Sequence, residues 1–220
     1  MAFLNKRAIY TCKRIRGIAP RVASPRIHRR TLGISLLGFL AGACLLLSVL
    51  TDTHAQIDQF KEFQVKSVFI YHLTNFVSWP DKAFDGMQAP LRIGVLGDNR
   101  FGTFLSKTVQ GEEVKGRHIV VDRIKKVKDL DPSTYHILFI SSSLKKQLPG
   151  ILQATQNWSV LTVGDTKGFA NLGGIVNFIR KGKRVHVEIN VNSAKRVGLT
   201  ISSKLLKLAK IVNGQQTMED

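Results

Sequence analysis

The chain has 220 residues, a formal net charge of +18, a hydrophobic fraction of 44% and two cysteines. Both cysteines, Cys12 and Cys44, precede residue 55, which excludes a disulfide, a thiolate nucleophile or a cysteine metal site from the rest of the chain. Residues 56–220 are numerous enough to build one ordinary hydrophobic core, so we expect a single folded domain.

The N-terminal segment is organised like an export signal. Residues 1–30 hold nine Lys+Arg and no Asp or Glu, residues 32–50 are uncharged and apolar, and Thr53-His54-Ala55 precedes Gln56. The basic region stays on the cytoplasmic side while the apolar region enters the membrane, and signal peptidase cleaves after small residues of this kind. We therefore expect residues 1–55 to be a signal peptide and the domain to be periplasmic.

Two other interpretations of this segment stay open. The apolar run is long enough to cross a membrane, so it could remain as an inner-membrane anchor with the domain in the periplasm. Ala41-Gly42-Ala43-Cys44 permits a lipoprotein, although the apolar stretch continues past Cys44. All three interpretations place the folded part outside the cytoplasm, away from the chromosome.

The exported part keeps a basic character. It carries 24 Lys+Arg against 14 Asp+Glu, a net charge of +10. Such a surface attracts anionic lipid, cell-wall polymer or an acidic protein face. Nucleic acid is not expected as a partner, because the compartment is wrong and the lysines are scattered without interleaved aromatic residues.

The hydrophobic pattern predicts alternating helices and strands. Asp58 is suited to cap a helix that runs to Phe76 and is ended by Trp79-Pro80. Further helices are expected over residues 100–109, from the Ser141–Ser143 cap to residue 155, and after Asn192. Apolar runs predict strands over residues 91–96, 118–122, 135–140, 159–163, 175–180 and 184–190.

This order of elements predicts an α/β fold, with a mainly parallel mixed sheet covered by helices on both faces and a C-terminal antiparallel hairpin and helix. In the hairpin, Lys181-Gly182-Lys183 forms the turn, and the second strand is expected to have a wet face. That wet face consists of His186, Glu188 and Asn190, and the last helix is expected to turn Leu199, Ile201, Leu205, Leu206, Leu208 and Ile211 to the core. We expect one domain over residues 56–212 and a flexible tail over 213–220.

No motif of a known enzyme class is found. The glycines of residues 94–102 do not match the dinucleotide fingerprint, and Ser141–Ser143 lack a Gly-x-Ser-x-Gly pattern and are interpreted as a helix cap. His72, His118, His136 and His186 have no second ligand at helical or hairpin spacing. The sequence therefore predicts a protein without catalytic residues, metal or cofactor.

The Gly-rich segment of residues 164–174 has two interpretations. It carries Phe169 and Leu172 between two predicted strands, and loops on rigid sheets are common places of recognition. Alternatively, Phe169 folds down as a lid over the core. The sequence does not decide between them.

With these segments laid out, the chain resembles the YfiR family over residues 63–212, through short matches in a fixed order. They are Phe69-Ile70-Tyr71, Phe76-Val77-Ser78-Trp79-Pro80, Ile93–Asp98, Phe101-Gly102, His136–Ser142, Val163-Gly164-Asp165, Gly168-Phe169-Ala170, Gly173-Gly174, Asn177-Phe178, Glu188-Ile189-Asn190, Ala194, Leu199–Ser203 and Leu205-Leu206.

The resemblance implies a non-catalytic periplasmic regulator. Such a protein binds the periplasmic sensor part of an inner-membrane diguanylate cyclase, holds it inactive and thereby lowers cyclic di-GMP and biofilm formation. The resemblance also implies a homodimer, and release by an outer-membrane, peptidoglycan-associated lipoprotein. Some relatives carry redox-sensitive cysteine pairs, and residues 56–220 contain no cysteine, so redox sensing is not carried over.

Apolar side chains on the surface would anchor such an interface. The candidates are Trp79, Phe169, Leu172 and Ile175. A periplasmic small-molecule binding protein is the alternative function, because parallel sheets form a crevice at their carboxyl edge.

Overall fold

The computed structural model describes residues 59–182 and 184–213, which belong to one compact unit. The predicted signal peptide, the cap at Asp58 and residues 214–220 of the predicted tail lie outside this range. Within it, no helix has the length and apolar character needed to cross a membrane.

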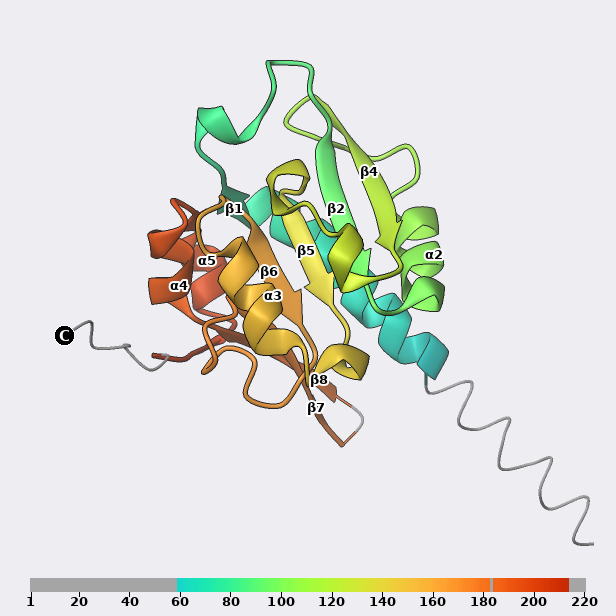
Figure 1. The fold of residues 1–220 in the computed structure, drawn as a ribbon, viewed down its shortest axis with the longest axis vertical. Coiled ribbons are helices and arrows are strands. Elements are labelled where there is room, and N and C mark those ends of the chain that lie inside the picture. Colours follow the sequence, from blue (N-terminus) through green and yellow to red (C-terminus); the bar gives the residue numbers. More distant parts are fainter. Residues whose placement is uncertain (1–58, 183, 214–220) are drawn as a thin grey trace, which may run out of the picture. The chain divides into compact units, whose positions relative to one another are not determined.

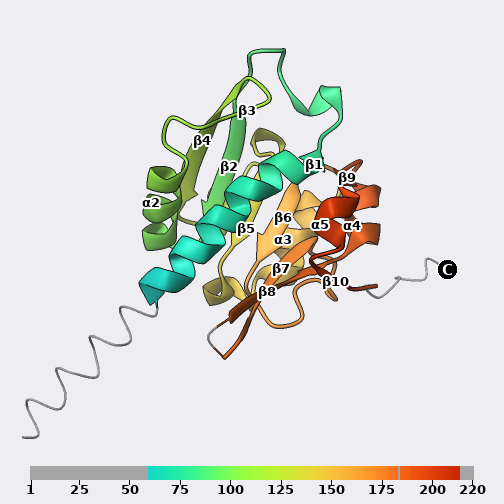
Figure 2. The ribbon, with the colours of Figure 1, turned by 180° about the vertical axis from the view of Figure 1, so that it is seen from behind.

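The first described element is a helix over residues 59–76, which ends where the sequence predicted. Ile70 and Leu73 on this helix, with Val77 just after it, are buried in the main core. Figure 2 shows the helix crossing one face of the sheet diagonally, while Figure 1 shows α3 (Leu148–Thr155) on the opposite face. The helix is long enough to contact several strands.

The main sheet has eight strands in the order β10-β8-β7-β6-β5-β2-β4-β3. The pairs β7–β8 and β3–β4 are antiparallel, and the other neighbours are parallel. The strands are β2 (Leu91–Leu96), β3 (Glu113–Val114), β4 (Arg117–Ile124), β5 (Ile137–Ile140), β6 (Leu161–Gly164), β7 (Val176–Lys181), β8 (Arg184–Ile189) and β10 (Lys210–Ile211). The predicted fold class is confirmed.

The remaining elements are short. A second sheet pairs β1 (Val77–Ser78) antiparallel with β9 (Thr200–Ile201). The helices are α2 (Asn99–Thr108), α4 (Val191–Arg196) and α5 (Ser203–Leu206), with single 3-10 turns at Asp81–Ala83, Val127–Asp129, Pro132–Thr134 and Ser142–Leu144.

Alternation along the central strands divides the core into two clusters. Ile93, Val95 and Phe139 belong to the larger cluster with the helix of residues 59–76 and α2. Leu138 and Ile140 belong to the smaller cluster with α3. Because both faces of the sheet are covered, the central strands appear in the sequence as nearly continuous runs of apolar residues.

The C-terminal quarter corrects three predictions. The helix after β8 is capped by Asn190, whose Oδ1 accepts from the Ser193 N–H, and not by Asn192. Instead of one last helix, the chain forms α4, β9, α5 and β10. Leu208 is therefore 83% exposed and Ile211 is also exposed, so neither reaches the core.

The prediction of a solvent-exposed face on the second hairpin strand, β8, is wrong for two of its three residues. Glu188 and Asn190 are buried, and only His186 is exposed. Lys210 from β10 donates to Glu188 Oε1 at 3.0 Å, which compensates the buried carboxylate. The side chain of Asn190 donates to the Ala170 carbonyl and so joins this edge to the loop between β6 and β7.

Candidate functional site

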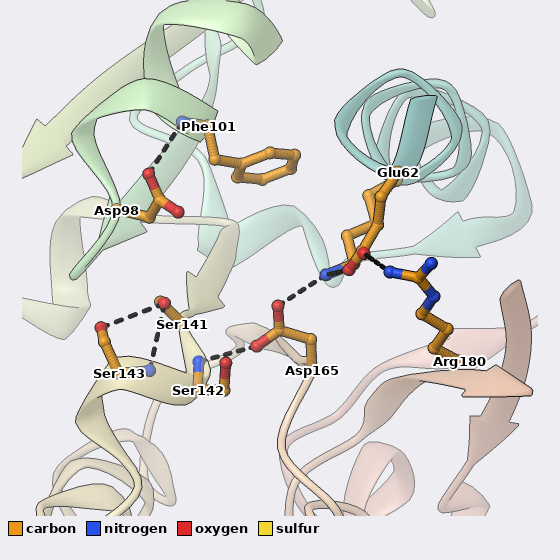
Figure 3. A network of polar contacts seen from close by, with 9 residues as sticks. Glu62, Asp98, Phe101, Ser141, Ser142, Ser143, Asp165 and Arg180 are labelled. Carbon is orange, nitrogen blue, oxygen red and sulfur yellow. Dashed lines mark hydrogen bonds and ion pairs between the residues drawn. The ribbon is translucent and has the colours of Figure 1, made fainter. Parts of the chain in front are cut away.

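The carboxyl edge of the parallel strands gathers polar residues, as such edges do in α/β folds. Asp98, Ser141 and Asp165 follow β2, β5 and β6, and Figure 3 shows them on neighbouring segments. Asp98 Oδ1 accepts from the backbone N–H of Arg100 and of Phe101, both at 3.0 Å, and so caps α2. The Asp98 side chain is therefore engaged by the backbone at the start of α2.

A buried lysine lies at the centre of this edge. Lys66 on the first helix is 5% exposed, and its Nζ is 2.6 Å from both Glu62 Oε1 and Asp165 Oδ2. The second oxygen of Asp165 accepts from the Ser142 N–H at 2.7 Å, and Arg180 lies 3.2 Å from Glu62 (Figure 3). Two carboxylates thus compensate the desolvated ammonium, as a buried charge requires.

This network connects three elements that are distant in the sequence. It ties the start of the first helix to the end of β6 and to the turn after β5. Each acid is bound to a cation or a backbone N–H, so the network positions the helix on the sheet edge. Sequence reasoning missed it, although the i,i+4 spacing of Glu62 and Lys66 was visible.

The described part of the chain contains no group of three or more His, Cys, Asp or Glu residues that could hold a metal ion. Ser141 Oγ accepts from the Ser143 N–H and so caps the 3-10 turn Ser142–Leu144. The helix that reaches residue 155 begins only at Leu148, after Gln147, so the prediction that these serines cap it is wrong. The predicted absence of catalytic residues stays a prediction.

An aromatic cluster lies at the opposite edge, where β5 begins. His136 is buried, its ring stacks on Phe84 with a centroid distance of 4.2 Å, and the guanidinium of Arg117 lies 4.0 Å from the centre of the Phe84 ring. His136 Nδ1 accepts from the Arg92 N–H at 3.0 Å, and its carbonyl accepts from the indole N–H of Trp79 at 3.1 Å. His136 is thus a hydrogen-bonded residue of the protein interior.

The loop of residues 165–174 packs around one phenylalanine. Phe169 is 0% exposed, and its ring fills the space that side chains at Gly164 and Gly174 would need. A Cβ at Gly164 would lie 2.4 Å from the ring, and one at Gly174 only 2.0 Å away. Of the two interpretations of Phe169, the structure therefore shows the lid over the core.

The four predicted anchors lie in different surroundings. Phe169 and Ile175 are buried, so the prediction that they present apolar surface to a partner is wrong. Trp79 is half-buried, and its N–H is already used by His136. Leu172 is 57% exposed, at the end of a short backbone turn in which its N–H donates to the Gly168 carbonyl. Of these four described residues, Leu172 alone has a largely exposed apolar side chain.

Comparisons with known proteins give one family match and no curated relative. A family model described as YfiR/HmsC-like matches residues 63–210. No curated protein matches the sequence.

Two solved structures show a remote likeness. The ABC domain in complex with L-Trp from Streptococcus pneumonia is 12% identical, with a TM-score of 0.42 over 56% of this chain and 55% of that one. A conserved domain protein from Vibrio cholerae is 15% identical, with a TM-score of 0.40 over 55% of this chain and 54% of that one. The chain spans about half the length of each, and at these TM-scores the likeness carries no functional argument.

Proposed function

Because the chain belongs to the YfiR/HmsC-like family, we propose that it inhibits an inner-membrane diguanylate cyclase by binding the periplasmic sensor part of that enzyme. The family is regulatory, non-catalytic and periplasmic, and the matched region covers nearly all of the described residues. Family membership is the observation that carries the proposal. A bound inhibitor would lower cyclic di-GMP and biofilm formation.

Inhibition of this kind needs only differential affinity. The protein must bind the inactive form of the cyclase more tightly than the active form, and a competitor that removes the protein then restores activity. We propose an outer-membrane, peptidoglycan-associated lipoprotein as that competitor, and a homodimer as the assembled state. Residues 56–220 have no cysteine, so release by thiol oxidation is not part of the proposal.

Leu172 is the anchor that we propose for the cyclase. Its loop is held by the buried Phe169 and by the hydrogen bond from Asn190 to Ala170, so little conformational freedom is lost when a partner covers the leucine. A few well-packed central residues carry most of the binding energy of an interface, and truncation of one of them weakens affinity by about 2 kcal/mol.

Gene deletion with complementation tests the proposal. Deletion should raise cyclic di-GMP and surface attachment, and expression of the wild-type gene should return both to their original levels. A gene that encodes the Leu172→Asp variant should lower both only in part, because binding would bury the new carboxylate at the interface. Met87→Asp is the matched control, since Met87 is another exposed apolar residue, at 90% exposure, and should complement fully.

Two outcomes contradict different parts of this proposal. Unchanged cyclic di-GMP on deletion, in cells that express the cyclase, contradicts cyclase inhibition itself. Full complementation by Leu172→Asp leaves inhibition standing and removes Leu172 as the anchor.

A further inference from the structure

An apolar groove lies on the sheet face that the first helix covers. Its volume is about 620 Å³, and three segments line it: the helix of residues 59–76, the β7–β8 hairpin, and the chain from α5 to β10. Ten of its fifteen lining residues are apolar, among them Val68, Leu73, Val187, Leu205 and Leu208. This volume is in the range of about 300–1,000 Å³ that is typical of sites for small organic ligands.

Both buried and exposed apolar side chains line the groove. Leu73, Val187 and Leu205 are buried, while Val68 and Leu208 at its edge are exposed. Val68 and Leu208 therefore extend the buried apolar lining out to the solvent. A hydrocarbon chain fits such a lining, because it gains burial along its length and leaves no polar atom without a partner.

The charged residues of the lining favour an anion. Glu188 is the acidic member, and it is bound to Lys210 at 3.0 Å, so these two charges compensate each other. Lys181 adds a positive charge that no further acid of the lining compensates. In the β7–β8 ladder it lies opposite Arg184, which is a second cation. His72 and His186 add two further nitrogen-bearing side chains.

We infer that this groove binds a monomeric organic anion of the fatty-acid class, with its chain on the apolar lining and its carboxylate toward Lys181. The inference goes beyond the proposed function and does not depend on it, because binding is measured without the cyclase. A single amphiphile is favoured over a bilayer, since the lining includes Leu73, Val187 and Leu205, which are buried and out of reach of a flat surface.

Decanoate below its micellar concentration is the probe. Isothermal titration calorimetry on the purified protein should give saturable binding, with a higher melting temperature when decanoate is present. Decan-1-ol and decyltrimethylammonium have the same chain without the negative charge, and both should bind at least tenfold more weakly, a difference of about 1.4 kcal/mol. Lys181→Gln should weaken decanoate and leave decan-1-ol unchanged.

Two neighbouring valines supply a matched pair of variants. Val68 and Val65 are both 40% exposed on the same helix, and only Val68 lines the groove. Val68→Asp should therefore weaken decanoate at least about tenfold, because it places a carboxylate beside the chain. Val65→Asp tests the same change of charge and helix propensity, and it should bind as the wild type does.

Three results would overturn the inference. They are decan-1-ol binding as tightly as decanoate, equal decanoate affinities for the two aspartate variants, and no saturable binding of decanoate. If decanoate does not bind and phosphatidylglycerol vesicles bind in a Val68-dependent way, the groove is assigned to a membrane surface.

Discussion

At His136, burial opposes a positive charge on the ring. Burial lowers the pKa of His136 below its ordinary value of 6.5, and Arg117 and Arg92 act in the same direction. The Ala83 carbonyl and Asp85 oppose this shift without reversing it. In addition, Nδ1 accepts from the Arg92 N–H, so a proton on Nδ1 would displace that bond.

Stability should therefore fall as the pH falls below 6.5. In that range the unfolded chain binds a proton at His136 that the folded chain does not, which favours unfolding. Urea unfolding at pH 7.5 and pH 5.0 measures the effect. His136→Asn, whose Oδ1 can accept the same N–H, should show a smaller loss between these two pH values. An equal loss in the variant would assign the pH dependence to other groups.

Lys66 gives a second prediction at the scale of one residue. Lys66→Met removes the cation between Glu62 and Asp165 and leaves two carboxylates facing each other. Breaking a buried ion pair in this way lowers the free energy of unfolding by about 3 kcal/mol. Urea denaturation should show that loss, and the double variant Lys66→Met/Asp165→Asn should recover part of it. Wild-type stability in Lys66→Met would mean that the network contributes nothing to the fold.

At the scale of elements, the loop of residues 165–174 depends on the absence of side chains at two glycines. Gly174→Ala places a methyl group 2.0 Å from a Phe169 ring carbon, so the ring or the loop must shift, and stability should fall by about 1–3 kcal/mol. Melting temperature measures the change.

Gly150→Ala is the control for this substitution. Gly150 lies inside α3, where an added Cβ would meet no atom within 4 Å. Alanine is favoured over glycine in a helix, so this variant should be as stable as the wild type or slightly more stable. Equal effects of the two substitutions would contradict the packing described for Phe169.

The elements that the sequence predicted well are those with a strong local signal. β2 has its predicted bounds, and the helix over residues 59–76 ends at its predicted residue. The two-residue strands β1, β3, β9 and β10 were missed, because such short segments show no hydrophobic period. The C-terminal leucines were read as one helix face, although short turns there send Leu208 to solvent.

For the whole molecule, the alternation of strands and helices and the family resemblance predicted the fold class and the family, and both are confirmed. The site was predicted less well. Burial of Phe169 and Ile175 depends on which strands become neighbours, and no local pattern contains that information. The Lys66 network and the apolar groove likewise combine residues from both ends of the domain.

The long separation of these contacts also bears on how the chain acquires its structure. Lys66 meets Asp165, which is 99 positions later, and Glu62 meets Arg180, which is 118 positions later. Synthesis proceeds from the N-terminus, so the apolar side of the first helix stays uncovered until the strands that receive it have been made. High contact order of this kind slows folding and prolongs the time during which apolar surface is exposed to solvent. We expect a newly made chain to need a chaperone during this interval.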